Sequence, residues 1–218
     1  MHEARSAPQP VHAIRRGLYL LTPDDIDTPR LLERVAAVVG SASLLQYRNK
    51  LADAALAAVQ VDALLPLCRR HGVPLLVNAD WTLAHAAGAD GAHLGEDDGD
   101  LQAAREALGP TAIIGASCYD SLAHAEAAAR AGASYLAFGA CFPSPTKPNA
   151  RRATPGLLRA ARQLDLPVVA IGGITPDNAR SVVEGGADLL AVISGVFDAP
   201  DPPAAAQAYL RAFDAGPH

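Results

Sequence analysis

The segment Pro167-Val-Val-Ala-Ile-Gly-Gly-Ile-Thr-Pro176 contains the structural unit that is repeated along the whole chain. Its short apolar run predicts a buried strand, and Thr175-Pro176 is typical of a helix cap followed by a first-turn proline. The glycine pair lies between the two, where it allows the backbone to approach another group closely. The segment therefore predicts a strand, a glycine-containing loop and a helix, in that order.

Eight such units follow one another in the 218 residues. The predicted strands are short apolar runs without strict alternation, which is typical of parallel strands covered on both faces. They span residues 17–21, 43–47, 74–78, 91–94, 112–117, 135–138, 167–171 and 189–193. The predicted helices span residues 29–39, 51–71, 81–87, 101–108, 122–131, 155–164, 177–184 and 203–213, the first of them capped by Thr28. This order predicts an α/β fold, a (β/α)₈ barrel over residues 17–218 with an N-terminal extension over residues 1–16.

A doubly wound open sheet is the alternative fold. Such a sheet usually carries a glycine-rich phosphate turn after its first strand, whereas the segment Leu18–Pro23 contains no glycine. A four-residue motif that is repeated before three strands is interpreted as a helix-to-strand turn with a left-handed glycine. Its three copies are Ala87-Gly-Ala-Asp90, Ala131-Gly-Ala-Ser134 and Gly185-Gly-Ala-Asp188.

The composition limits the classes of partner. The formal net charge of −5 argues against general binding to nucleic acid or to anionic membranes, so small molecules are the expected partners. No apolar segment reaches the ~20 residues of a membrane span, and the first residues lack the apolar core of a signal peptide. The three cysteines form no Cys-x-x-Cys pair, which favours reduced thiols in the cytoplasm. Self-association is left open.

Polar residues follow several of the predicted strands, and the carboxyl ends of barrel strands are where reactive groups belong. Gln46, Arg48 and Lys50 end the second strand at alternate positions, so an extended chain would point all three to one side. One amide and two cations there predict an anion site, although a solvated turn with ordinary charges is the other interpretation. Asn78 ends the third strand and Ser117 ends the fifth.

Phosphate sites and a metal site are predicted on the same rim. Barrels frequently bind phosphate with the loops after strands 7 and 8, which here contain Gly172-Gly173 and Ile193-Ser194-Gly195. The proline-rich loop 139–149 displays Ser144, Thr146 and Lys147, which suits a polyanion unless it is an ordinary surface loop. Asp80, Asp97 and Asp98 supply carboxylates for Mg²⁺, or else an acidic helix start. His93 is interpreted as a core residue.

Together these motifs make the chain resemble the thiamine-phosphate synthase family, from about Gly17 to the C-terminal helix. The resemblance rests on their order and spacing: Gln-Tyr-Arg-x-Lys at 46–50, Asn78, the run Gly88-Ala-Asp-Gly-x-His-Leu-Gly-x-x-Asp98, Gly-x-Ser at 115–117, Phe-Pro-Ser-Pro-Thr-Lys at 142–147, Ile-Gly-Gly-Ile at 171–174, and Ile-Ser-Gly at 193–195. The family implies a barrel transferase that joins hydroxymethylpyrimidine diphosphate to a thiazole phosphate, carboxylated or not, and releases pyrophosphate. The implied reaction is dissociative, through a resonance-stabilised cation.

The resemblance also implies a role for each matching residue. Arg48, Lys50, Ser117 and Lys147 would be catalytic. The pyrimidine diphosphate would contact Gln46, Tyr47, Arg48, Asn49, Lys50, Asn78, Ser117 and Lys147, and the thiazole phosphate would contact Ser144, Pro145, Thr146, Gly173, Ile193 and Ser194. Asp98 would bind Mg²⁺. The family's second metal-binding Asp is replaced by Ala79, so we expect Asp80 or water to take its place, which requires the chain to turn there.

Two rival functions differ in class. A thiazole tautomerase of the same barrel family would lack the full Gln-x-Arg-x-Lys set and use a histidine near the fifth strand end, where this chain has Ser117-Cys118. A non-catalytic phosphate-binding barrel is suggested by Ala79. An assay with both substrates separates all three functions.

Overall fold

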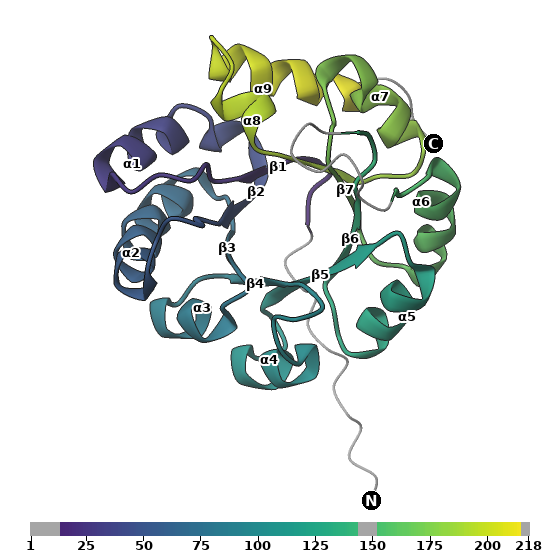
Figure 1. The fold of residues 1–218 in the computed structure, drawn as a ribbon, viewed down its shortest axis with the longest axis horizontal. Helices are drawn as coiled ribbons and strands as arrows, with labels where there is room; N and C mark the ends of the chain where they lie inside the picture. The colour runs from purple at the N-terminus through teal and green to yellow at the C-terminus, as the bar shows by residue number, and fades with distance from the viewer. Residues whose placement is uncertain (1–13, 144–151, 215–218) are drawn as a thin grey trace, which may run out of the picture.

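A computed structural model describes residues 14–143 and 152–214, and within them eight parallel strands close into a barrel. Each strand pairs with the next along the chain, and the last pairs with the first (Figure 1). The strands are β1 (Gly17–Leu21), β2 (Ala42–Tyr47), β3 (Leu75–Asn78), β4 (Gly91–Leu94), β5 (Ile113–Tyr119), β6 (Tyr135–Gly139), β7 (Val168–Ile171) and β8 (Leu189–Val192). The predicted barrel is confirmed, and the open-sheet alternative is wrong.

The helices form a ring outside the barrel (Figure 1). They are α1 (Thr28–Ala36), α2 (Ala54–His71), α3 (Trp81–Ala87), α4 (Leu101–Leu108), α5 (Leu122–Arg130), α6 (Pro155–Ala161), α7 (Pro176–Glu184), α8 (Ser194–Phe197) and α9 (Pro202–Leu210). Three predicted helices end in a short 3₁₀ segment, at Val39–Ser41, Arg162–Leu164 and Arg211–Phe213. The short helix α8 was not predicted.

One predicted cap is wrong. Asp27, not Thr28, caps α1, because its carboxylate accepts a hydrogen bond from the N–H of Arg30 at 2.9 Å. Thr28 and Pro29 are therefore the first two residues of the helix. Thr154 and Thr175 do cap α6 and α7, each followed by the predicted proline.

Alternation along the strands divides the buried apolar residues into two clusters. The larger cluster lies between the strands and the helices and includes Leu45, Val77 and Phe138. The smaller cluster fills the barrel interior, with Leu44, Leu76 and Val169 among its members. Since side chains of a strand alternate between the two, the position of a residue within its strand decides whether it faces the interior.

The repeated helix-to-strand turn is confirmed and has an additional role. One glycine of each copy has positive φ: 66° at Gly88, 93° at Gly132 and 113° at Gly186, whereas Gly185 stays helical with φ −69°. The last residue of each copy also accepts a hydrogen bond from the start of the preceding strand. Asp90 accepts from the N–H of Leu75 at 2.8 Å, Ser134 from that of Ile114 at 3.0 Å, and Asp188 from that of Val168 at 3.0 Å. These polar side chains therefore fix the end of the barrel opposite to the rim.

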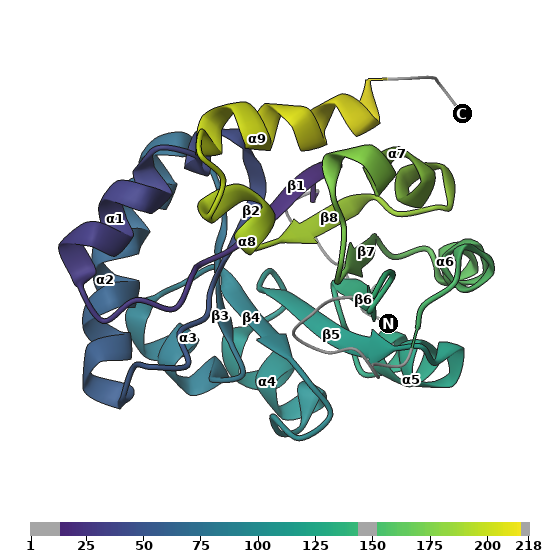
Figure 2. The same cartoon turned by 45° about the horizontal axis from the view of Figure 1, so that its top comes forward.

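In the described part of the chain, no helix has both the length and the apolar composition that a membrane crossing requires. The chain leaves each strand at its carboxyl end and returns through an outer helix, so the loops after the strands share one rim (Figure 2).

Candidate active site

The residues after β2 divide between two sides, as the alternation predicts. Tyr47 donates its hydroxyl hydrogen to Gln60 Oε1 at 2.8 Å, and Asn49 donates to the same oxygen at 2.9 Å. Burial raises the pKa of Tyr47 to about 12, so its phenol stays protonated at neutral pH. The side chains of Tyr47 and Asn49 are therefore engaged with α2, while Arg48 and Lys50 are left to face the rim.

Arg48 is held from two directions. Its backbone N–H donates to Thr22 Oγ1 at 2.8 Å, and the Thr22 hydroxyl donates back to the Arg48 carbonyl at 2.8 Å. Asp24 lies 3.7 Å from the guanidinium and accepts a hydrogen bond from the Lys50 N–H at 2.8 Å. The loop after β1 thus orients the cations that the sequence placed after β2.

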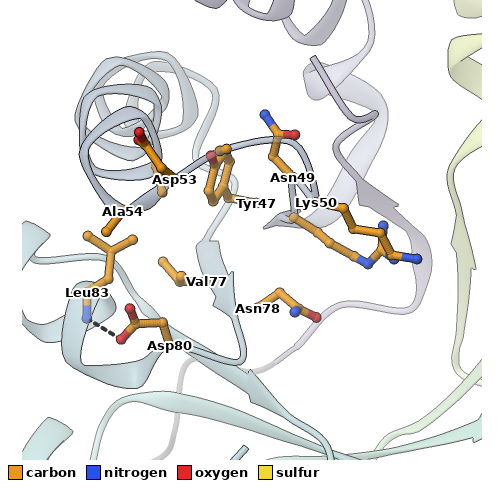
Figure 3. Close-up of a pocket in the computed structure, with 12 residues that line it drawn as sticks. Tyr47, Asn49, Lys50, Asp53, Ala54, Val77, Asn78, Asp80 and Leu83 are labelled. Atoms are coloured by element: carbon orange, nitrogen blue, oxygen red, sulfur yellow. Dashed lines mark hydrogen bonds between the residues drawn. The ribbon is translucent and has the colours of Figure 1, made fainter. Parts of the chain in front are cut away.

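Arg48 and Lys50 line a cavity of about 410 Å³ with Asn78, the last residue of β3, and Asp80, which follows it. Figure 3 shows Lys50 and Asn78 extending from neighbouring strand ends toward the same space, with Asp80 at the start of α3. The volume is within the range of small-molecule sites. Two cations and an amide at its wall suit a multiply charged anion such as a diphosphate.

The chain turns at Ala79, as the Asp80 hypothesis requires. Ala79 has φ 66°, and the Asp80 N–H closes a three-residue turn on the Asn78 carbonyl at 2.7 Å. One carboxylate oxygen of Asp80 caps α3, accepting from Leu83 N–H at 2.8 Å and from the Thr82 hydroxyl at 2.6 Å. Burial acts to raise the pKa of Asp80, but these hydrogen bonds outweigh it and hold the pKa below its usual value. Asp80 is therefore an anion with one oxygen already engaged.

Asp98 is fixed in a similar way. Its Oδ2 accepts from the Gly95 N–H at 2.7 Å, and a Cβ added at Gly95 would lie 3.0 Å from that oxygen. Among the described residues, no group of three or more His, Cys, Asp or Glu side chains could hold a metal ion. Asp80 follows β3 and Asp98 follows β4, and within residues 14–143 and 152–214 one carboxylate oxygen of Asp98 has no hydrogen bond. Mg²⁺ fits this donor set, because it binds through one or two carboxylates together with water and substrate phosphate.

The barrel interior contains a polar chain that was not predicted. Ser117 Oγ lies 2.9 Å from His93 Nε2, and the other ring nitrogen lies 2.8 Å from the Tyr135 hydroxyl. Tyr135 contacts the Tyr19 hydroxyl at 2.7 Å, which accepts from Gln46 Nε2 at 2.6 Å. His93 was interpreted as a core residue, and its place inside the barrel could have been found from strand alternation, since it shares a face with Gly91.

The loops after β6, β7 and β8 meet at one place. Gly172 and Gly173 have φ of 96° and 66°, and a Cβ on them would lie 2.7 Å from Ala140 and 2.8 Å from Phe142. Tyr209 of α9 donates to the Ile174 carbonyl at 2.9 Å, and a Cβ on Gly195 would lie 2.1 Å from its hydroxyl. Both glycine clusters therefore allow these loops to pack closely.

The structure thus places the predicted residues in three groups on the barrel. Tyr47, Arg48, Asn49, Lys50, Asn78 and Asp80 line the cavity, Gln46 and Ser117 end the polar chain, and Gly173, Ile193 and Ser194 lie at the glycine loops. Ser144, Pro145, Thr146 and Lys147 lie outside the described residues.

Comparisons with known proteins agree with this arrangement. A family model described as thiamine monophosphate synthase matches residues 18–196. The chain is 57% identical over 198 residues to a thiamine-phosphate synthase of Xanthomonas campestris pv. campestris (strain 8004), covering 91% of this chain and 96% of that protein. It is 56% identical over 202 residues to a thiamine-phosphate synthase of Aromatoleum aromaticum, covering 92% and 97%.

A solved structure gives the same result. Thiamine phosphate pyrophosphorylase from Pyrococcus furiosus superposes with a TM-score of 0.80 at 33% identity, over 92% of this chain and 96% of that one.

Proposed function

The chain belongs to the thiamine monophosphate synthase family, and we propose that its rim couples hydroxymethylpyrimidine diphosphate to hydroxyethylthiazole phosphate or its carboxylated form. The products are thiamine phosphate and pyrophosphate, which makes the protein a transferase. The observation that carries the assignment of the site is the cavity shared by Arg48, Lys50, Asn78 and Asp80 at the ends of β2 and β3.

In this proposal the diphosphate occupies that cavity. Arg48 and Lys50 balance its charge, Asn78 donates hydrogen bonds, and Lys147 is the third cation that we assign to the diphosphate. Arginine binds phosphate oxygens through two parallel N–H groups. The Thr22 hydroxyl holds the backbone of Arg48 in place before the ligand binds. Tyr47 and Asn49 contribute by positioning this segment, because both are hydrogen-bonded to Gln60.

Asp98 and Asp80 would hold Mg²⁺, with diphosphate oxygens and water as the other ligands. When bound, Mg²⁺ would stabilise the negative charge that accumulates on the departing pyrophosphate. Asp98 is in position for this role because the Gly95 N–H fixes one of its oxygens and leaves the other without a partner among the described residues.

The residues of the chain stabilise charge and align the two substrates, and none is required as a strong base or nucleophile. The C–O bond between the pyrimidine methylene and the diphosphate breaks, and the thiazole nitrogen then attacks the resulting cation. Arg48, Lys50 and Lys147 stabilise the leaving group electrostatically. Gly173, Ile193, Ser194 and the segment Ser144-Pro145-Thr146 hold the thiazole phosphate so that its nitrogen faces the methylene carbon.

The proposal predicts where the reaction occurs and with what partners. The ligands are small molecules, and the free thiols of Cys68, Cys118 and Cys141 suit the reducing cytoplasm. Burial raises the pKa of Cys141 to about 11 and leaves it an unreactive thiol at neutral pH.

The test is to incubate the full chain with both substrates and Mg²⁺ and to quantify all products by mass spectrometry. We expect equal amounts of thiamine phosphate and pyrophosphate. An isomerised thiazole without coupling would instead identify a tautomerase, and unchanged substrates would identify a binding protein. Either outcome would contradict the proposal.

A further inference from the structure

A continuous chain of hydrogen bonds crosses the barrel interior. It joins side chains of five different strands in the order Gln46, Tyr19, Tyr135, His93 and Ser117, with successive separations of 2.6, 2.7, 2.8 and 2.9 Å. Its two ends, Gln46 and Ser117, are both residues that we assign to the pyrimidine substrate. Tyr19, Tyr135 and His93 lie between them and have no role in the mechanism described so far.

The fold is shaped around the middle of this chain. A Cβ added at Gly115 would lie 1.9 Å from Tyr135 Cζ, so only glycine at that position leaves room for the phenol ring. The His93 ring stacks on Tyr135 with centroids 5.6 Å apart, and Tyr19 meets Tyr135 edge-on at 5.7 Å. These contacts fix the three rings relative to one another. One ring therefore cannot rotate by itself to change its hydrogen-bond partners.

If the two buried tyrosine hydroxyls each donate their one hydrogen within the chain, only two directions are possible. In the first direction Gln46 donates to Tyr19, Tyr19 to Tyr135, Tyr135 to His93 Nδ1, and His93 Nε2–H to Ser117. The hydroxyl hydrogen of Ser117 is then free to point at a ligand. In the second direction every donor and acceptor is exchanged, Ser117 donates inward, and the Gln46 amide is turned over.

The buried amide decides between the two directions. Gln46 is 1% exposed, and its Oε1 has no hydrogen-bond partner among the residues that the structure describes. The second direction would satisfy that oxygen but leave both N–H groups of the amide unpaired in the barrel interior. Unpaired buried N–H groups are rarer in proteins than carbonyl oxygens without partners, which favours the first direction. Burial also lowers the pKa of His93 to about 4, although Asp98 opposes this shift, so the ring carries a single hydrogen at neutral pH.

We propose that the chain runs from Gln46 to Ser117 and fixes His93 as the Nε2–H tautomer, so that Ser117 donates to the pyrimidine substrate while Gln46 Oε1 accepts from it. Tyr19, Tyr135 and His93 are then positioning residues. The identity of the ligand rests on the proposed function, whereas the tautomer of His93 does not.

The tautomer is read directly by two-bond ¹H–¹⁵N NMR, with the His93 signals assigned from a His93→Phe variant. We expect a protonated Nε2 and a hydrogen-bonded, unprotonated Nδ1 at pH 7. In Tyr135→Phe the Nδ1 resonance should move toward that of a free imidazole nitrogen. Tyr209→Phe is the matched control, because it removes a buried phenol hydroxyl that takes no part in the hydrogen bonds between Gln46 and Ser117. A protonated Nδ1 in the unmodified protein would overturn the proposal.

The positioning role is tested by a double-mutant cycle on kcat/KM for the pyrimidine diphosphate. His93→Phe should lower this value about tenfold when Ser117 is present, the effect of losing one hydrogen bond. In a Ser117→Ala background the same change should alter it less than twofold, because both residues act through one hydroxyl. Equal losses in the two backgrounds would show that His93 does not act through Ser117.

The two experiments separate this inference from the function on which it is built. If the unmodified protein does not couple the substrates, the proposed function fails, and the NMR experiment still decides the direction of the chain. If coupling occurs and the tautomer is Nδ1–H, the function stands and the inference fails.

Discussion

Arg48 is held in place before any ligand binds. Thr22 fixes its backbone through two hydrogen bonds, and Asp24 holds its guanidinium at 3.7 Å. Its conformational freedom is therefore reduced in advance, which lowers the entropy lost when an anion binds. A diphosphate would replace Asp24 as the principal partner of the guanidinium.

Arg48→Ala should lower kcat/KM by about 100-fold, because it removes a cation from the leaving group in the transition state. The free energy of unfolding should change little, since the ion pair of the guanidinium with Asp24, at 3.7 Å, is partly exposed to solvent. Steady-state kinetics and urea unfolding of the same preparation measure both quantities.

Arg180→Ala is the matched control, because within residues 14–143 and 152–214 the Arg180 guanidinium pairs with Glu184 alone, on the surface of α7. Its kinetics should equal those of the unmodified protein. If Arg48→Ala and Arg180→Ala had the same kcat/KM, the role given to Arg48 would be wrong.

Ala79 adopts a left-handed conformation, with φ 66°, which costs most residues about 1–2 kcal/mol. Asp tolerates this conformation better than Ala, and Asp here would add a carboxylate between Asn78 and Asp80, which line the cavity. We expect Ala79→Asp to lower the Mg²⁺ concentration for half-maximal activity about tenfold, or roughly 1.4 kcal/mol of binding.

Ala79→Gly separates the carboxylate from the conformation. Glycine should stabilise the fold by about 0.5 to 1 kcal/mol without changing the Mg²⁺ requirement. A Mg²⁺ requirement that shifts equally in Ala79→Asp and Ala79→Gly would mean that the added carboxylate is not a metal ligand.

At the scale of single residues, sequence reasoning could find the polar groups but not all their partners. The alternation of Gln46, Arg48 and Lys50 could be predicted, because strand geometry imposes it. The hydrogen bonds of Tyr47 and Asn49 to Gln60 could not be predicted, since Gln60 lies on a helix whose rotation about its axis the sequence does not specify. The contact between His93 and Ser117 depends on the closure of the barrel, which no local pattern records.

At the scale of elements, the repeated turn joins helix ends to strand starts in the same way three times. Glycine turns the chain, and the following polar residue accepts a hydrogen bond from the previous strand. Two of these acceptors are carboxylates, and hydrogen bonds to charged groups are worth more than neutral ones. The sequence predicted the turn from its glycine, but the hydrogen bond links segments that are distant in sequence.

Asp90→Ala should reduce the free energy of unfolding by about 1–3 kcal/mol, because the Leu75 N–H loses its acceptor. Urea unfolding measures the loss. In Asp90→Asn the amide oxygen can still accept, so most of the stability should return. An Asn variant as unstable as the Ala variant would show that this hydrogen bond is not the source of the effect.

At the scale of the whole molecule, buried Asp25 links the loop after β1 to two helices. Arg30 of α1 donates two hydrogen bonds to the Asp25 carboxylate, at 2.6 and 2.7 Å. Gln60 of α2 donates to the Asp25 backbone carbonyl at 2.9 Å. The Arg30 hydrogen bonds, together with one from the Asp27 N–H and the charge of Arg34, lower the pKa of Asp25 below 3.8 although burial opposes them. Ionised Asp25 therefore stabilises the fold at pH above about 4, and this contribution is lost as the pH falls through the folded-state pKa.

Asp25→Asn should consequently be less stable than the unmodified protein at pH 7, with a difference that stays constant down to about pH 4 and narrows below it. Urea unfolding at a series of pH values measures this difference. A difference that does not change between pH 7 and pH 3 would show that ionisation of Asp25 does not contribute.

The architecture as a whole was predictable because eight repeated units leave few closed arrangements for a parallel sheet. Local chemistry indicated most strand ends and helix starts. The exceptions include α1, which Asp27 caps in place of Thr28, α2, which begins at Ala54 and not at Leu51, and β5, which extends beyond Ser117 to Tyr119. The short helix α8 was missed because its four residues contain no periodic pattern. The grouping of the predicted site residues followed from the barrel itself, which places every strand end on one rim.

The most direct test of the shared site is a crystal structure of the full chain with Mg²⁺, pyrophosphate and thiamine phosphate. We predict pyrophosphate against Arg48, Lys50 and Asn78, with Mg²⁺ on Asp98 and the phosphate of the other product at Gly173 and Ser194. Pyrophosphate bound elsewhere, with the 410 Å³ cavity empty, would contradict the account.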